Sequence, residues 1–295
     1  MNRARSVAEV LERFAHLAQD AKLVHDSFYK FVPIEDVDAM LASLRDASEG
    51  LLGSILVAPE GINGMLAATS EELDAFQDKL KDEEAFGHKF DDMVVKRSLC
   101  KSIPFHTMKI RKKPEIVPLG VAGVDASRQT GVNVSPQEWR ALIQREDVVV
   151  IDNRNDFEYR LGHFAGAVNP EVCNFRDFPK YIEEQLPLWQ DAGKHIAMYC
   201  TGGIRCEKTS AWMLDLGVEV YQLEGGILNY FEQMPDADRD WQGECFVFDN
   251  RIALNSRLEE TDTGVESVYD PGRDGAWRVE RAQLLQYGPQ PSRAD

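Results

Sequence analysis

The sequence contains no run of eighteen apolar residues, and so no segment with the length and composition of a membrane-spanning helix. Its start also lacks the apolar core of a signal peptide, because charged residues such as Arg3, Arg5 and Glu9 interrupt it. We therefore expect a cytoplasmic protein that has no contact with a membrane.

Cysteine and histidine are scarce. The five cysteines are odd in number, scattered, and absent from the first 99 residues; they are Cys100, Cys173, Cys200, Cys206 and Cys245. This distribution argues against a disulfide framework or a zinc cluster and favours thiol chemistry in a reducing compartment. The six histidines do not occur in the two-histidine, one-carboxylate spacing of non-haem iron enzymes, and no segment is typical of a flavin or haem site. We therefore predict no metal and no bound cofactor.

Positive charge is also in short supply. The 33 Lys and Arg stand against 50 Asp and Glu, and the net charge of −17 disfavours a nucleic-acid partner on average. The exception is residues 96–113, which include seven basic residues and no acidic one. The basic residues are Lys96, Arg97, Lys101, Lys109, Arg111, Lys112 and Lys113. This local reversal of sign suits a polyanion such as RNA. The alternative is an edge strand on which lysines block pairing with another chain.

The length of 295 residues suggests two domains. Residues 1–20 are predicted to form an amphipathic helix that either packs on the body or stays free. Residues 21–115 are predicted to run strand, helix, strand, strand, helix, strand, with a hairpin turn at Pro59–Gly61. This order is the split βαβ pattern of a ferredoxin-like α+β domain. Residues 116–130 have few periodic apolar residues and are predicted to be a linker.

Residues 131–235 have the pattern of an α/β domain. The continuous apolar run at 148–151 is typical of a central parallel strand that is covered on both faces. Residues 236–295 are predicted to be a C-terminal extension. Its polar part, from residue 256 onward, is expected to be poorly ordered.

Cys200 lies where a short predicted strand gives way to a predicted helix. The loop between them consists of Thr201, Gly202, Gly203 and Ile204 and is followed by Arg205. The N–H groups of such a loop, a helix N-terminus and a guanidinium together form an anion pocket that lowers the pKa of a thiol. We therefore expect Cys200 to be a nucleophile and Arg205 to stabilise an anion. The alternative is a small buried cysteine beside a turn. Cys206 is predicted either to resolve an oxidised Cys200 as a disulfide or only to pack.

Two segments resemble the rhodanese homology domain. Residues 152–169 have its first signature, an Asp-x-Arg followed by Glu and then by Gly-His-x-x-Gly-Ala, and residues 200–206 resemble its active loop. The resemblance implies a rhodanese-like fold in which Asp152 and Arg154 form the floor of the site. Phosphatases of this fold have five residues between the cysteine and the arginine, whereas this chain has four. The smaller loop suits a single sulfur or oxygen atom on Cys200, so a phosphatase is disfavoured.

Further segments, at 57–64, 223–227 and 243–249, extend the resemblance to the bacterial tRNA uridine 5-hydroxylases. The resemblance implies oxygen-dependent hydroxylation of the wobble uridine of tRNA at carbon 5, giving 5-hydroxyuridine, with molecular oxygen as co-substrate. Members often continue into a cysteine-rich tail of metal-ligand type. This chain has no cysteine after Cys245, so no metal role is expected for its tail.

Cys200 has two chemical roles open to it in this reaction. It adds to carbon 6 of the pyrimidine and makes carbon 5 electron-rich, or it carries activated oxygen, while Arg205 holds a developing anion or a tRNA phosphate. The alternative function is a sulfurtransferase that carries a persulfide on Cys200. An inactive interaction module is disfavoured because both residues are present. The N-terminal domain and the basic stretch favour tRNA as the partner, and no stable protein partner is predicted.

Overall fold

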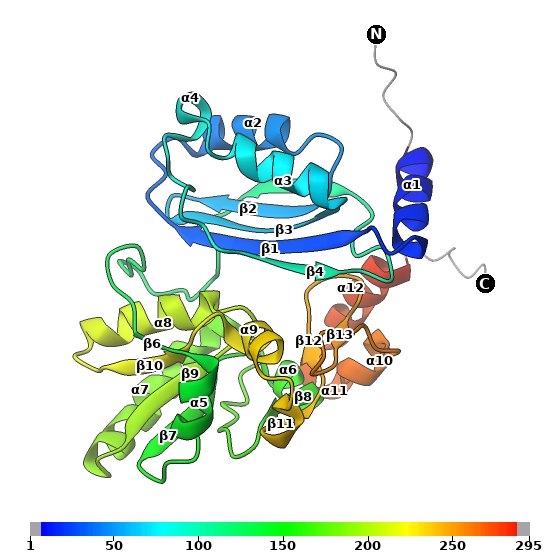
Figure 1. Cartoon of the computed structure of the whole chain (residues 1–295). Coiled ribbons are helices and arrows are strands. Elements are labelled where there is room, and N and C mark those ends of the chain that lie inside the picture. The colour runs from blue at the N-terminus through cyan, green and yellow to red at the C-terminus, as the bar shows by residue number, and fades with distance from the viewer. Residues whose placement is uncertain (1–6, 288–295) are drawn as a thin grey trace. The chain divides into compact units, whose positions relative to one another are not determined.

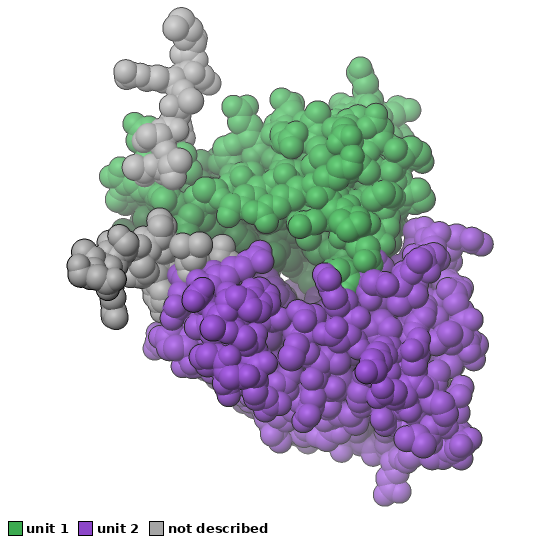
Figure 2. Space-filling view, turned by 180° about the vertical axis from the view of Figure 1, so that it is seen from behind, with its two compact units in different colours: residues 1–118 green, residues 119–295 purple. Residues whose placement is uncertain are grey.

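The computed structural model describes residues 7–287, and the chain divides after Pro118 into two compact units (Figures 1 and 2). We call them the N-terminal unit, up to Pro118, and the C-terminal unit, from Leu119. Within residues 7–287, every helix is too short or too polar to cross a lipid bilayer.

The N-terminal unit is a five-stranded sheet that carries helices α2, α3 and α4 on one face (Figure 1). Its elements are α1 (Val7–Gln19), β1 (Val24–Phe31), α2 (Val37–Ala47), β2 (Leu52–Ala58), β3 (Gly61–Ala68), α3 (Ser70–Lys79), α4 (Glu83–Phe86), β4 (Val95–Leu99) and β5 (Met108–Lys112). The sheet order is β4-β1-β3-β2-β5; β5 runs parallel to β2, and the other pairs are antiparallel. The succession from β1 to β4 confirms the predicted ferredoxin-like α+β fold. β5 is a fifth strand beyond that prediction.

Alternating apolar residues explain why the helices lie on one face of this sheet. In β2, Ile55 and Val57 are two residues apart, fully buried, and therefore on the same side. α2 covers them with a buried stripe that includes Met40 and Leu44. Phe14 of α1 is fully buried in the same core, so the N-terminal helix packs on the body. Residues 1–6 of the predicted helix lie outside the described residues.

The C-terminal unit is built on a four-stranded parallel sheet in the order β6-β10-β9-β7. Its elements up to the end of the sheet domain are β6 (Val132–Val134), α5 (Pro136–Leu142), β7 (Val148–Asp152), α6 (Asp156–Leu161), β8 (Gly162–Phe164), η1 (Phe175–Asp177), α7 (Phe178–Asp191), β9 (His195–Tyr199), α8 (Ile204–Asp215), β10 (Val220–Leu223) and α9 (Gly226–Gln233). Alternating strands and helices of this kind confirm the predicted α/β class for this part of the chain.

The apolar run at 148–151 forms a parallel strand, but β7 is the outermost strand of the sheet and not a central one. Its outer edge is covered by Val168. The N–H of Val168 donates to the carbonyl of Val150 over 2.7 Å, and its carbonyl accepts from the N–H of Asp152 over 3.1 Å. Val150 and Ile151 point to opposite faces of the sheet and are both buried, so β7 has the apolar sequence of a strand that is covered on both faces.

The residues after α9 pack against the sheet domain. They form η2 (Ala237–Arg239), β11 (Trp241–Gly243), β12 (Cys245–Phe246), β13 (Ala253–Leu254), α10 (Val265–Val268), α11 (Pro271–Asp274) and α12 (Ala276–Tyr287). β11 pairs antiparallel with β8, and β12 pairs with β13. The structure differs from the prediction of poor order after residue 256, because Val265 and Val268 are buried against Phe157. Two apolar residues in a short helix are too few to show in the composition, and residues 288–295 lie outside the described residues.

Both ends of the predicted linker, residues 116–130, are held by hydrogen bonds. The Nδ2 of Asn63 donates to the carbonyl of Ile116 over 3.1 Å, within the N-terminal unit. The Nε2 of Gln129 donates to the carbonyl of Ala211 over 3.1 Å, within the C-terminal unit.

Candidate active site

The loop after β9 holds Cys200 just before α8. Cys200 follows the last residue of β9 and is fully buried. Gly203 has a φ of 106°, which side-chain-bearing residues rarely adopt, and its N–H donates to the Sγ of Cys200 over 3.2 Å. Glycine at this position therefore lets the backbone turn an N–H group toward the sulfur.

The start of α9 supports the same loop. The N–H of Ile227 donates to the carbonyl of Cys200 over 3.0 Å, and the N–H of Leu228 donates to the carbonyl of Thr201 over 3.1 Å. A Cβ on Gly226, which has a φ of 69°, would lie 2.4 Å from the carbonyl oxygen of Cys200, so only glycine permits this approach. The segment 223–227 thus fixes the backbone of the Cys200 loop.

The surroundings of Cys200 favour its thiolate. Burial alone would raise the pKa of the thiol. A hydrogen bond from the Cys206 thiol, the charge of Arg205 and the N–H groups of Cys206 and Gly203 outweigh burial, and the pKa of Cys200 lies well below its usual value. The pKa of Cys206 moves upward, because the thiol is buried and hydrogen bonds to Cys200. The two pKa values move in opposite directions, so Cys200 gives up its proton more readily than Cys206.

Arg205 is held by Glu158, which was not predicted from the sequence to belong to the site. The Nη1 and Nη2 atoms of Arg205 donate to the two carboxylate oxygens over 2.7 and 2.8 Å, and both side chains are buried. Burial would raise the pKa of Glu158, but the charge and hydrogen bonds of Arg205 lower it. The sequence signals at Glu158 are its place in the signature at residues 152–169 and the capping box Asn155-x-x-Glu158, which predicts a helix start. Glu158 both caps the start of α6 and holds Arg205. A tRNA phosphate at Arg205 would therefore compete with this carboxylate.

Asp152, the last residue of β7, forms a buried ion pair with Arg154. The Nε and Nη2 atoms of Arg154 donate to Asp152 over 2.8 and 2.6 Å, and Nη2 also donates to the carbonyl of Gly162 over 2.6 Å. The hydroxyl of Tyr199 donates to Asp152 over 2.7 Å. Because Tyr199 directly precedes Cys200, this network fixes the strand end from which the Cys200 loop starts.

The seven basic residues predicted to bind tRNA all belong to the N-terminal unit but are divided between the two edges of its sheet, where β4 and β5 lie. Lys96 and Arg97 are on β4, Lys101 follows β4, Lys109, Arg111 and Lys112 are on β5, and Lys113 follows β5. Arg97 donates from Nε and Nη2 to the buried Asp26 over 2.7 and 2.8 Å, and from Nη1 to Asp74 of α3 over 2.8 Å. The guanidinium of Arg97 is therefore engaged by two carboxylates.

The basic side chains of β5 alternate between the two faces of the sheet. Lys112 pairs with Asp38 of α2, with 2.8 Å between Nζ and Oδ2, and so lies on the same face as Ile110, which packs on the core. Lys109 and Arg111 alternate with these residues and therefore point to the face opposite the helices. Both are exposed.

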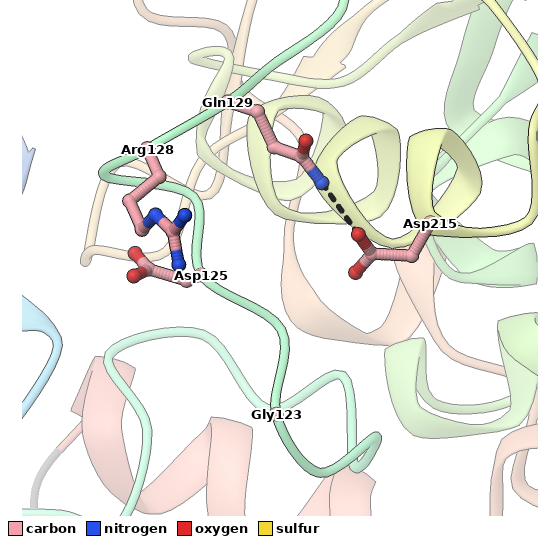
Figure 3. Close-up of a pocket in the computed structure, with 5 residues that line it drawn as sticks. All are labelled: Gly123, Asp125, Arg128, Gln129 and Asp215. Carbon is pink, nitrogen blue, oxygen red and sulfur yellow. Dashed lines mark hydrogen bonds between the residues drawn. The ribbon is translucent and has the colours of Figure 1, made fainter.

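Within residues 7–287, no group of three His, Cys, Asp or Glu side chains has the arrangement of a metal site. A surface hollow lies elsewhere in the C-terminal unit and is lined by Gly123, Asp125, Arg128, Gln129 and Asp215 (Figure 3). The Nε2 of Gln129 donates to Asp215 there over 2.7 Å. Asp215 ends α8 and Cys200 precedes its start, so about 18 Å of helix separates the two places. The hollow is not part of the Cys200 site.

The fold and the site together define a rhodanese-type protein with an appended α+β domain. Residues 135–233 match the rhodanese-like domain family, and residues 23–116 match the family described as UPF0176 acylphosphatase like domain.

Curated relatives extend over both domains. The tRNA uridine(34) hydroxylase of Legionella pneumophila (strain Corby) is 43% identical over 236 residues, which cover 79% of this chain and 91% of that protein. The tRNA uridine(34) hydroxylase of Synechococcus sp. (strain CC9605) is 45% identical over 251 residues, 82% of this chain and 77% of that protein. That of Nitrobacter winogradskyi is 44% identical over 240 residues, 80% of this chain and 92% of that protein. The chain belongs to the tRNA uridine(34) hydroxylase family, which confirms the resemblance found in its sequence.

Proposed function

We propose that this protein hydroxylates uridine 34 of tRNA at carbon 5, giving 5-hydroxyuridine, with molecular oxygen as co-substrate and Cys200 as the catalytic thiolate. The observation that carries the proposal is the stabilised thiolate of Cys200, in a chain of the tRNA uridine(34) hydroxylase family. The protein acts in the cytoplasm and needs no stable protein partner.

The thiolate has a direct use at a pyrimidine. When it adds to carbon 6 of uracil, the ring becomes an enolate and carbon 5 becomes electron-rich enough to take oxygen. A thiolate is required because the neutral thiol is a far weaker nucleophile. Loss of the proton from carbon 5 and departure of Cys200 from carbon 6 then restore the ring double bond.

The overall reaction needs two electrons from outside the substrate. One oxygen atom of O2 goes to carbon 5 and the other leaves as water. The Cys200 thiolate and the Cys206 thiol supply both electrons when they become a disulfide, and the Cys206 thiol and the solvent supply one proton each. Uridine, O2, one thiolate, one thiol and one proton thus give 5-hydroxyuridine, water and one disulfide. A cellular thiol then reduces the disulfide by exchange. The hydrogen bond between the two sulfur groups supports this role for Cys206.

Two residues of β5 are the preferred candidates for holding tRNA. Lys109 and Arg111 are exposed and lie on the face opposite the helices, whereas Lys112 and Arg97 already pair with carboxylates. Phosphate contacts of this kind position a nucleic acid without reading its sequence. The wobble uridine is then presented by the anticodon loop, which is single-stranded.

The experiment is a reaction of the purified protein with tRNA that lacks modification at position 34, under oxygen-18 gas and with a thiol reductant. Mass spectrometry of the nucleosides should show 5-hydroxyuridine that contains oxygen-18, with none formed by Cys200→Ser. If the oxygen in the product came from water, O2 would not be the co-substrate. If the tRNA contained thiouridine and Cys200 carried one added sulfur atom, the protein would be a sulfurtransferase and not a hydroxylase.

A further inference from the structure

Phe248 is an exposed ring in an otherwise buried segment. Its neighbours Phe246, Val247 and Asp249 are 4%, 5% and 8% exposed, whereas Phe248 is 52% exposed. A half-exposed phenylalanine forgoes part of the stabilisation that burial of its ring would give. The segment belongs to the motif 243–249, which the resemblance singles out and to which the reaction described above assigns no role.

The turn that carries Phe248 is held firmly. The N–H of Val247 donates to the carbonyl of Ile252 over 2.9 Å, which closes the turn. Arg251 donates to Asp249 from its backbone N–H, Nε and Nη2 over 3.0, 2.9 and 2.7 Å, and both side chains are buried. Ile252 has a φ of 64°, which is strained for a β-branched residue, and strained backbone of this kind is frequent at functional sites.

Phe248 also lies beside the active-site arginine. The centre of its ring is 5.8 Å from the Cζ of Arg205, whose charge lowers the pKa of Cys200 and whose guanidinium is fixed by Glu158. The edge of the ring is set by Phe246, at 5.0 Å between ring centres and an angle of 88° between ring planes. The ring is therefore oriented on the protein side and open on the solvent side.

We propose that Phe248 is a stacking platform for an unpaired base of the anticodon loop at the Cys200 site. This inference rests on the proposed function, because it needs a single-stranded RNA loop to reach Cys200. Proteins that bind unpaired bases place exposed aromatic rings against them, since every base has a face that stacks. The guanidinium of Arg205 lies over the Phe248 ring as a cation–π contact and ties the ring to the Cys200 site. Phe248 thereby holds the base while Cys200 reacts.

The first test is binding of an anticodon stem-loop to Phe248→Leu, which keeps an apolar side chain but loses the aromatic face. The dissociation constant should rise about 5- to 150-fold, the range for loss of one stacked base. Phe248→Tyr should bind like the wild type. Trp277→Leu is the matched control, because Trp277 is also an exposed aromatic of the C-terminal unit, at 57% exposure, and its loss should leave binding unchanged.

The second test is photocrosslinking of stem-loops that carry 5-iodouridine at position 33, 34 or 35. The crosslinked peptide should contain Phe248 for at least one of these positions. The thiolate absorbance of Cys200 should be unchanged in Phe248→Leu, which separates a contact to RNA from a collapse of the site.

The inference is overturned if Phe248→Leu binds within twofold of the wild type or if no crosslink reaches Phe248, while the wild type binds and hydroxylates tRNA. A wild type that neither binds nor hydroxylates tRNA would instead overturn the proposed function.

Discussion

Neutralising either member of the Glu158–Arg205 pair tests how the site is held. Both hydrogen bonds of the pair are short, at 2.7 and 2.8 Å, and the side chains of Glu158 and Arg205 are 0% and 7% exposed. Removing one partner leaves the other charge buried without compensation, which costs about 3–5 kcal/mol of unfolding free energy. We therefore expect Glu158→Gln and Arg205→Gln each to lose about that much.

The double variant Glu158→Gln/Arg205→Gln removes both charges at once. It should lose much less than the sum of the two single losses, because no uncompensated charge remains. Urea unfolding followed by tryptophan fluorescence is the assay, because all five tryptophans lie in the C-terminal unit: Trp139, Trp189, Trp212, Trp241 and Trp277. Single losses below about 1 kcal/mol, or a double loss equal to the sum of the single losses, would refute this reasoning.

The same variants separate effects on the pKa of Cys200 from effects on the free energy of unfolding. Arg205→Gln removes a positive charge from the surroundings of Cys200, so the pKa of Cys200 should rise. Glu158→Gln removes a negative charge, so that pKa should not rise. The ultraviolet absorbance of the thiolate, titrated against pH, measures both. An equal rise in both variants would show that the pKa depends on packing alone.

Three further predictions concern the thiols and the basic residues of β5. Cys206→Ser keeps a hydrogen-bond donor beside Cys200 but cannot form a disulfide, so it should lose turnover to the same extent as Cys206→Ala. If Cys206→Ser keeps its turnover and Cys206→Ala does not, Cys206 acts only as a hydrogen-bond donor. The folded-state pKa of Cys200 lies below its ordinary value of 9.0, so its contribution to stability is present above pH 9.0 and is lost as the pH falls toward the folded-state pKa. The unfolding free energy of the wild type minus that of Cys200→Ser should therefore grow with pH in this window, by up to about 1.4 kcal/mol per pH unit, and a flat difference in urea titrations would contradict it. The double variant Lys109→Ala/Arg111→Ala should weaken tRNA binding and reduce the slope of log affinity against log salt concentration by about 1.4–1.8. Lys112→Ala is the control and should change neither quantity, because the Lys112 side chain faces α2. Equal effects of the two variants would contradict the assignment of these side chains to opposite faces of the sheet.

The Cys200 loop was predictable because its signals are local. A strand of five residues, two glycines and a helix start are enough to locate the loop, and the charged groups that follow it set the chemistry. Glu158 was not predictable in the same way. It is 47 positions from Arg205 in the sequence, and neither the helix cap nor the signature at residues 152–169 to which it belongs indicates that it pairs with Arg205.

The order of helices and strands was predictable from the sequence, but the strands that lie at the edges of the two sheets were not. β5 pairs in parallel with β2, with Ile110 opposite Ile55, and no local pattern specifies such a distant partner. For the same reason the sequence does not show that the basic residues divide between opposite edges of one sheet. The outer position of β7 was missed because side chains on both of its faces are buried, as they are in a central strand.

The proposal that this protein forms 5-hydroxyuridine at position 34 through Cys200 can be tested in cells. The measurement is mass spectrometry of tRNA nucleosides from cells that lack the protein, after complementation with the wild type, Cys200→Ser or Cys173→Ser. Cys173 is exposed and serves as the control thiol. We expect 5-hydroxyuridine derivatives to disappear in the deletion strain and to return with the wild type and Cys173→Ser but not with Cys200→Ser. Restoration by Cys200→Ser, or unchanged 5-hydroxyuridine together with a loss of 2-thiouridine in the deletion strain, would contradict it.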